Sequence, residues 1–166
     1  AHQLMLNDPA LKEELRSEIR GNLVSASSAV KAVFLRWEKR FLLMESQMAR
    51  QKGDDMHDIS NRLSNALAGI TIHPLERIPP GSVLVANRLL PSDTIFLSQQ
   101  STAAVLLEYG GAGSHAALFA REMGLPCIAG IPMILKALPA DAWALVDANL
   151  GEVIVYPQAE HKARFQ

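Results

Sequence analysis

Residues 109–118 read YGGAGSHAAL, and this stretch decides how the second half of the chain is interpreted. It follows the apolar residues 102–107, a pattern typical of a buried strand, and it runs into residues 114–123, which have a helical pattern. Glycines at three of four successive positions let the backbone turn sharply and come close to a ligand. The sequence therefore predicts a strand, a glycine-rich turn and a helix that starts near Ser114.

The start of this helix has the features of an anion site, because free backbone N–H groups and the positive end of the helix dipole meet there. Ser114 is the expected N-cap, and the imidazole of His115 lies in the first turn. A neutral histidine in such a place can attack a phosphoryl group and hold it covalently. The turn lacks the lysine of a nucleotide-binding P-loop. The alternative interpretation is an ordinary tight turn followed by a capping or buried histidine.

The residues around this turn predict an α/β layer domain over residues 82–157, since strand-like and helical patterns alternate there. A connector rich in proline and glycine, residues 70–81, precedes it, and residues 158–166 are expected to be a C-terminal tail. The expected strands are residues 82–86, 102–107 and 126–129, a short helix is expected to begin at 91–93, and a hairpin is expected over 142–147 and 152–156.

Residues 1–69 have a different pattern, which predicts an all-α helical bundle. Asp8 followed by Pro9 is a helix start, with Asp8 as the N-cap, and we expect this helix to end at Gly21. The sequence does not begin with methionine, and its first residues already have an apolar helical pattern. We therefore expect the chain to be a segment of a longer polypeptide.

A longer apolar stripe with three- and four-residue spacings predicts a second helix, capped by Ser25 or Ser27 and continuing to Met48. Gly53 is expected to interrupt the helical run, and Gly69 to stop it. We expect antiparallel helices joined by short turns.

The composition excludes several classes of protein. The 166 residues have a formal net charge of −1, which argues against a nucleic-acid-binding protein, and apolar runs are too short for a membrane span. Cys127 is the single cysteine, so the chain forms no internal disulfide, and we expect a cytoplasmic location. His2, His57, His73 and His161 lack the spacing of a metal site.

Residues 110–121, followed by residues 124–130, resemble the phosphohistidine signature of the phosphoenolpyruvate (PEP)-utilising enzymes, in which Gly-Gly-x-Thr-Ser-His precedes an Ala-Arg pair and a Gly-Ile-Pro strand. Gly113 stands where the family usually has threonine, which removes one hydroxyl beside the phosphate. The resemblance implies that His115 carries the phosphoryl group. It also implies phosphate-binding roles for Gly111, Gly113, Ser114 and Arg121.

Within that family the chain resembles the N-terminal region of enzyme I of the PEP:sugar phosphotransferase system. The order of helical bundle, connector and phosphohistidine domain is that of enzyme I, and residues 54–63 and 91–94 are similar to stretches of it. Thr94 lies 21 residues before His115, the spacing of an enzyme I threonine that hydrogen-bonds the active histidine. The resemblance implies that Thr94 orients His115 and fixes its tautomer; a plain helix-start residue is the alternative.

The resemblance implies a phosphotransferase with a swivelling α/β phosphohistidine domain and a helical subdomain, residues 1–69, that docks the carrier protein HPr. His115 would take phosphate at Nε2 from PEP on a separate barrel domain, which would also hold magnesium, so we expect no metal or cofactor in this chain. Candidate docking residues are Met44, Met48, Lys52 and Asp55, although methionines at helical spacing are more often core residues. Similar modules occur in multiphosphoryl transfer proteins, including the dihydroxyacetone kinase phosphotransferase subunit.

Two other functions stay open at this point. The chain could be an interaction module that binds HPr or a kinase subunit without transferring phosphate. Gly113 in place of the family's threonine is compatible with that alternative. It could also be the swivelling domain of a PEP synthase or a dikinase, although the helical bundle argues against this.

Overall fold

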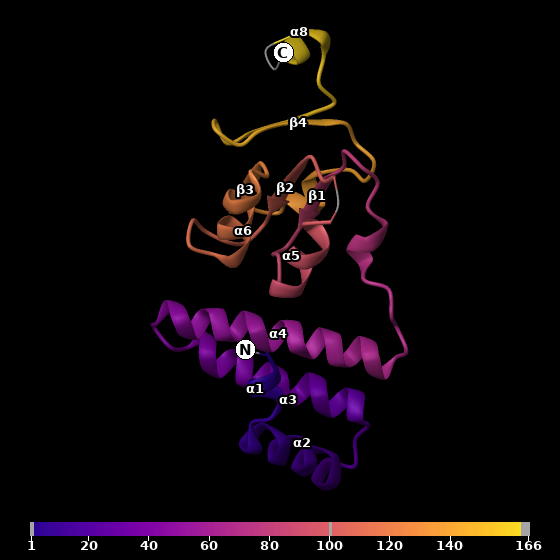
Figure 1. The fold of residues 1–166 in the computed structure, drawn as a ribbon, viewed down its shortest axis with the longest axis vertical. Helices are drawn as coiled ribbons and strands as arrows, with labels where there is room; N and C mark the ends of the chain where they lie inside the picture. Colours follow the sequence, from indigo (N-terminus) through magenta and orange to yellow (C-terminus); the bar gives the residue numbers. More distant parts are fainter. Residues whose placement is uncertain (1, 100, 164–166) are drawn as a thin grey trace. The chain divides into compact units, whose positions relative to one another are not determined.

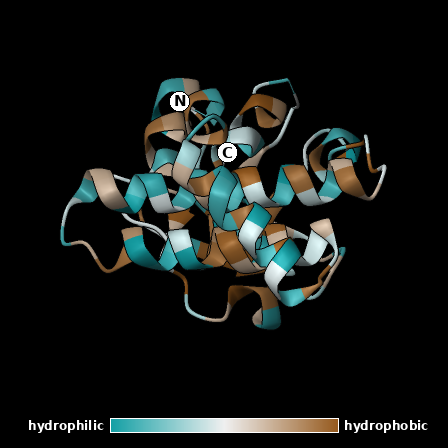
Figure 2. Cartoon of the chain, turned by 90° about the horizontal axis from the view of Figure 1, so that it is seen from below, coloured by the Kyte–Doolittle hydropathy of each residue, from teal (hydrophilic) through white to brown (hydrophobic). Residues whose placement is uncertain are grey.

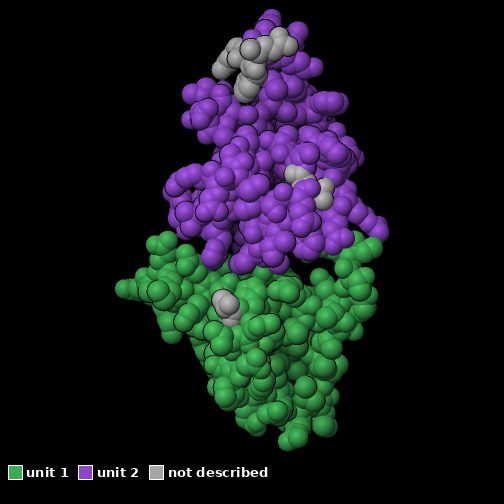
Figure 3. All heavy atoms as spheres, viewed as in Figure 1, with its two compact units in different colours: residues 1–73 green, residues 74–166 purple. Residues whose placement is uncertain are grey.

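A computed structural model of the chain describes residues 2–99 and 101–163. The chain divides into two compact units, residues 1–73 and residues 74–166, which are coloured separately in Figure 3. The division falls inside the proline-rich stretch 70–81, which contains a short 3₁₀ helix, η1 (Pro74–Arg77). Each unit has its own hydrophobic core, so each is described by itself.

The first unit is all-helical, in agreement with the predicted class. Helices α3 and α4 pack against each other along their length, and α2 packs against α3 (Figure 1). The helices are α1 (His2–Leu6), α2 (Pro9–Asn22), α3 (Ala26–Leu42) and α4 (Gln47–Leu67). The core consists of side chains from α2, α3 and α4, which are Leu11, Val30, Val33, Phe34, Met56 and Ile59. Their three- and four-residue spacing within each helix places them on one face.

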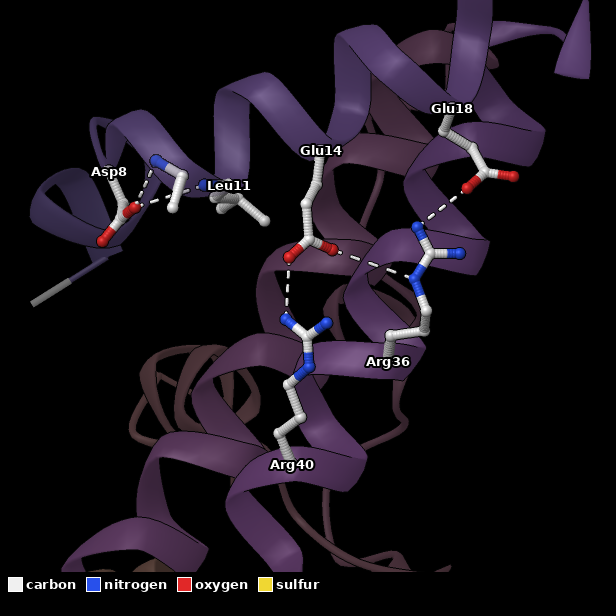
Figure 4. Close-up of polar contacts among 7 residues, drawn as sticks. Asp8, Leu11, Glu14, Glu18, Arg36 and Arg40 are labelled. Carbon is white, nitrogen blue, oxygen red and sulfur yellow. Dashed lines mark hydrogen bonds and ion pairs between the residues drawn. The ribbon is translucent and has the colours of Figure 1, made fainter. Parts of the chain in front are cut away.

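The start of α2 confirms the predicted cap. The carboxylate of Asp8 accepts hydrogen bonds from the backbone N–H groups of Ala10, at 2.8 Å, and Leu11, at 3.2 Å (Figure 4). Pro9 follows in the first turn, where its lack of an N–H costs nothing. The cap places Leu11 at the centre of the core, where its side chain is fully buried.

We expect Asp8→Ala to lower the free energy of unfolding by about 0.5–2 kcal/mol, because two N–H groups of the first turn lose their acceptor. Denaturant unfolding followed by far-ultraviolet circular dichroism measures the change. Asp8→Asn is the matched control, since the amide oxygen can still accept from both groups. An alanine variant as stable as the parent chain would show that the cap contributes nothing.

Three predicted helix boundaries are wrong. Helix α2 continues past Gly21, and Leu23 takes the left-handed conformation at its end, with φ of 51°. The long helix is broken by residues 43–46, and Ser46 caps the start of α4. Gly53 lies inside α4 and is buried, and a Cβ there would approach Leu42 Cδ2 to 3.3 Å. The glycine therefore provides close packing of α3 and α4 and does not interrupt the helix.

Ion pairs connect the exposed sides of α2 and α3 (Figure 4). Arg40 contacts Glu14 at 2.7 Å, and Arg36 contacts Glu18 at 2.8 Å. Hydrogen bonds from Arg36 and then Asn22 lower the pKa of the Glu18 carboxyl below its usual value. The arginines are exposed and the glutamates partly covered, so we expect these pairs to fix how α2 aligns along α3 and to contribute little to the stability.

The second unit has a parallel three-stranded sheet, as the alternation of strands and helices predicts. Strands β1 (Val83–Ala86), β2 (Ala104–Leu107) and β3 (Cys127–Ala129) lie in the order β1-β2-β3. Helix α5 (Pro91–Leu97) connects the first two strands, and α6 (His115–Met123) connects the second pair (Figure 1). The central strand β2 is buried along its whole length, which its unbroken apolar sequence requires.

The core of this unit lies between the sheet and helices α5 and α6. Val105 and Leu107 of β2 contact this core, together with Leu97 of α5 and Ala116 of α6. A predicted hairpin follows, with strands β4 (Ala144–Asp147) and β5 (Glu152–Val155). Two short helices were not predicted, α7 (Ile134–Ala137) and α8 (Ala159–Ala163), and α8 lies within the expected C-terminal tail. No helix among the described residues is long and apolar enough to span a membrane.

Candidate functional site

The glycine-rich turn and the start of α6 form the candidate site. Ser114 is the N-cap of α6, and its hydroxyl accepts a hydrogen bond from Ala117 N at 3.2 Å. The N–H of Ser114 itself donates to Gly111 O at 2.9 Å, which closes the turn. Gly110 has φ of +131°, a conformation that residues with a side chain rarely adopt. The cap, the turn hydrogen bond and the backbone conformation of Gly110 together make His115 the first residue of α6.

The side chain of His115 has one nitrogen without a partner. The residue as a whole is half-buried, but its Nε2 atom is buried and makes no hydrogen bond. An unpaired buried ring nitrogen is unusual and often marks a site that needs it free. In this ring orientation Nε2 is closed to solvent, so a phosphoryl group reaches it only after the ring or its neighbours move.

Thr94 lies on α5, which packs against α6, but it does not hydrogen-bond His115 as predicted. Its hydroxyl donates to the carbonyl oxygen of Pro91 at 2.7 Å. A threonine within a helix commonly bonds the carbonyl one turn earlier, and here that local acceptor takes the only hydroxyl hydrogen. The predicted hydrogen bond is therefore corrected to a bond within α5.

Thr94→Val removes this hydroxyl with little change of shape, and we expect it to lower the free energy of unfolding by about 1 kcal/mol. The rate of phosphate transfer should fall less than tenfold, because the hydroxyl is not bonded to His115. Rapid-quench measurement of labelled chain across a range of pH gives the rate and its pH profile. Thr94→Ser is the control. A much larger loss of transfer rate in Thr94→Val, with a normal rate in Thr94→Ser, would contradict this expectation. It would show that the Thr94 hydroxyl does position His115.

The phosphate-binding candidates do not all lie on one side of α6. Gly111, Gly113 and Ser114 belong to the turn beside His115, and both glycines are exposed. Arg121 follows His115 by six residues, which places it about 120° away around the helix. The phosphate-binding role predicted for Arg121 stays a prediction, and the helical period places this residue on a different side of α6 from His115.

Arg121 instead lines a cavity of about 760 Å³ on another side of α6. The cavity also touches Gly111 of the turn, Cys127 of β3 and Asp147 of the hairpin, but not His115. Partial burial raises the pKa of the Cys127 thiol. The Asp147 carboxylate accepts hydrogen bonds from the backbone N–H groups of Asn149 and Leu150, which shape the hairpin turn.

The docking candidates on the helical unit differ in their accessibility. Met44, Met48 and Lys52 are exposed, so the two methionines are not core residues. Asp55 is mostly covered and pairs with His2, Nε2 to Oδ1, at 3.1 Å. Leu43, which sequence reasoning overlooked, is 85% exposed between α3 and α4. An apolar residue just past the end of an amphipathic stripe was the available signal.

Metal-ligand side chains do not gather in the described part of the chain: no group of three or more histidine, cysteine, aspartate or glutamate side chains lies close enough to hold an ion. The roles predicted for His115, the turn and the docking residues stay predictions about function. The structure gives their positions.

Known proteins similar to this chain agree with the predicted family. Residues 1–52 match the model of the N-terminal domain of PEP-utilising enzymes, and residues 78–151 match the model of their mobile domain. A phosphoenolpyruvate-protein phosphotransferase of Haloferax volcanii is 35% identical over 162 residues, which is 98% of this chain and 28% of that protein. The chain thus spans less than a third of the length of that relative.

Two solved structures are similar over nearly the whole chain. An NMR structure of enzyme I has a TM-score of 0.71 and 26% identity, covering 99% of this chain and 66% of that one. A structure described as the N-terminal domain of a nitrogen enzyme I has a TM-score of 0.54 and 25% identity, covering 97% and 65%. The chain therefore belongs to the PEP-utilising enzymes, within which it corresponds to the N-terminal region of enzyme I.

Proposed function

We propose that this chain is a phosphoryl-relay module in which His115 carries phosphate between a PEP-binding domain and an HPr-type phosphocarrier. The observation that carries the proposal is the position of His115, first residue of α6 behind a glycine-rich turn, in the part of the chain that matches the mobile domain. Phosphoryl transfer needs mainly positioning and stabilisation of negative charge, which a helix N-terminus and turn amides supply.

In the proposed reaction the lone pair of His115 Nε2 attacks the phosphorus of PEP. A phosphorus–nitrogen bond forms as the phosphorus–oxygen bond breaks, and the leaving enolate takes up a proton from water at its methylene carbon to become pyruvate. The ring nitrogen of the carrier histidine then attacks the same phosphorus, and His115 recovers its lone pair. Because Nε2 is closed to solvent in the structure, the ring of His115 has to turn outward before the first step.

PEP and magnesium are proposed to bind a separate barrel domain, in keeping with the fraction of the relatives that this chain spans. The setting is either an enzyme I or a multiphosphoryl transfer protein such as the phosphotransferase subunit of the dihydroxyacetone kinase system. We place the relay in the cytoplasm, which the unpaired Cys127 supports.

A docking module without transfer activity is the second candidate. The buried Nε2 atom and the hydroxyl of Thr94, which bonds Pro91 instead of His115, favour it. Incubating the chain with an intact PEP–protein phosphotransferase, HPr and labelled PEP separates the two. Acid-labile, alkali-stable label on the chain supports the relay. Binding of HPr without label supports the docking module, and label taken from ATP would indicate a dikinase-type domain instead.

A further inference from the structure

One face of α6 borders a cavity that the proposed phosphate transfer does not use. The cavity has a volume of about 760 Å³, which is within the range of small-molecule sites, and Arg121, Cys127 and Asp147 line it, whereas His115 does not. We propose that this cavity binds a free amino acid with an apolar side chain, whose carboxylate pairs with Arg121 and whose ammonium group pairs with Asp147. This binding does not depend on phosphate transfer by His115.

Helix α6 presents both an apolar and a charged surface to the cavity. Hydrophobic and hydrophilic residues alternate along the helices of this chain, as Figure 2 shows. In α6, Ala117, Ala120 and Arg121 line the cavity, and Gly124 lines it just past the end of the helix. Arg121 and Gly124 follow Ala117 by four and seven residues, so these residues lie on one face of α6, and His115 lies on another. The small side chains of the alanines leave room beside the guanidinium group.

The guanidinium group of Arg121 is available to a ligand. Its side chain is exposed, and no described residue forms an ion pair or a side-chain hydrogen bond with it. The backbone beside it is held by Gly124, whose N–H donates to Arg121 O at 3.3 Å and whose φ is 60°. An arginine without a counter-charge offers a planar set of N–H donors that matches the two oxygens of a carboxylate.

A carboxylate lines the same cavity. Asp147 is the last residue of β4, and its Oδ1 atom accepts hydrogen bonds from the N–H groups of Asn149, at 2.9 Å, and Leu150, at 3.0 Å. These bonds hold the side chain in place, and Oδ2 has no partner in the part of the chain that the structure describes. Asp147 is too far from Arg121 to form an ion pair with it. Two opposite charges therefore line one cavity without neutralising each other.

The pair of opposite charges disfavours simpler ligands. An anion held by Arg121 would share the cavity with the Asp147 carboxylate, and a cation held by Asp147 would share it with the guanidinium group. A wholly apolar ligand would leave both charges unmatched. A zwitterion supplies a counter-charge to each, and free amino acids are the small metabolites that have this pair of charges on adjacent groups.

The rest of the lining favours an apolar side chain on the ligand. Leu125 and Pro126, which lead into β3, and Val146 of β4 supply aliphatic surface. The thiol of Cys127, whose pKa is raised by burial, adds an uncharged surface. Asn149 on the wall is exposed, so the cavity is open to solvent and a ligand can enter it.

The test is calorimetric titration of the whole, unphosphorylated chain with L-leucine and L-phenylalanine. Each amino acid is compared with the acid that has a hydroxyl in place of its ammonium group and with the amine that lacks its carboxylate. We expect saturable binding of at least one amino acid, with affinity for its two analogues at least about tenfold lower. Binding should weaken as salt rises, because both contacts are ionic.

Arg121→Gln and Asp147→Asn each remove one charge, and the asparagine oxygen can still accept the N–H bonds of the hairpin turn. Each variant should lower the affinity for the amino acid about tenfold, and Asp147→Asn should abolish the preference over the hydroxy analogue. Lys136→Gln and Asp141→Asn are the matched controls, since both residues are exposed in the same unit and do not line the cavity. Circular dichroism checks that all variants fold.

Two-dimensional ¹H–¹⁵N NMR locates the ligand, because Gly111, Ala112 and Asn149 line the cavity and their amide signals should shift on binding. Absence of saturable binding of both amino acids would overturn the proposal. So would a hydroxy analogue or inorganic phosphate that binds as tightly as the amino acid, which would indicate a simple anion site. Charge variants that bind like the parent chain would overturn it too. The proposed function is tested separately, since label on His115 is measured without amino acid.

Discussion

Replacing His115 with alanine is expected to lower phosphate incorporation into the chain by about three orders of magnitude or more, because no other side chain of the site can form the phosphorus–nitrogen bond. The measurement is the acid-labile, alkali-stable label acquired from PEP through an intact phosphotransferase and HPr. Binding of unphosphorylated HPr should change little, because the residues predicted to dock it belong to the helical unit.

His161→Ala is the matched control, since that histidine lies on α8 and its Nδ1 accepts a hydrogen bond from Gln158 N. The control should label like the parent chain. Loss of label in both variants would point to a general defect in folding. Full labelling of His115→Ala would remove His115 from the reaction.

Phe34→Ala should have the largest effect on stability, a loss of about 3–5 kcal/mol in the free energy of unfolding of the helical unit. Phe34 is 1% exposed at the centre of a core that α2, α3 and α4 share, so its removal leaves a cavity between three helices. Differential scanning calorimetry should show the effect in the transition of residues 1–73, while the second unit, which has a separate core, keeps its own transition.

Leu35→Ala is the neighbouring control, because Leu35 is 49% exposed on the same helix and its loss creates no buried cavity. Its transition temperature should stay close to that of the parent chain. Equal destabilisation by the two substitutions would show that α3 is not packed as described.

Most of the fold could be predicted because local patterns and tertiary packing agree. Asp8 with Pro9, Ser25 and Ser114 identify helix starts, and the predicted cap geometry is present at each. The prediction for Gly53 was wrong because a glycine within a helical pattern looks the same in the sequence in two cases. It can end the helix, or it can let a neighbouring helix pack closely against it. Only the approach of Leu42 decides between them.

The position of the candidate site in the chain could be predicted from the sequence, but the contacts between its side chains could not. The glycine-rich turn predicts where His115 lies, since φ preferences and helix capping act over a few residues. The partner of Thr94 depends on a competition between Pro91 O and the imidazole, which no local pattern encodes. The phosphate-binding role of Arg121 rests on the motif resemblance and stays a prediction, and the helical period places this residue on a different side of α6 from His115.

Coupled ³¹P and ¹⁵N NMR of the chain, labelled at its histidine rings and phosphorylated from PEP through HPr, tests the central claim most directly. The account predicts one phosphorus–nitrogen coupling, to Nε2 of His115, with the ring turned out of the orientation in which Nε2 is buried. A chain that stays unphosphorylated while it binds HPr, or that carries the phosphate on a different histidine, would contradict it.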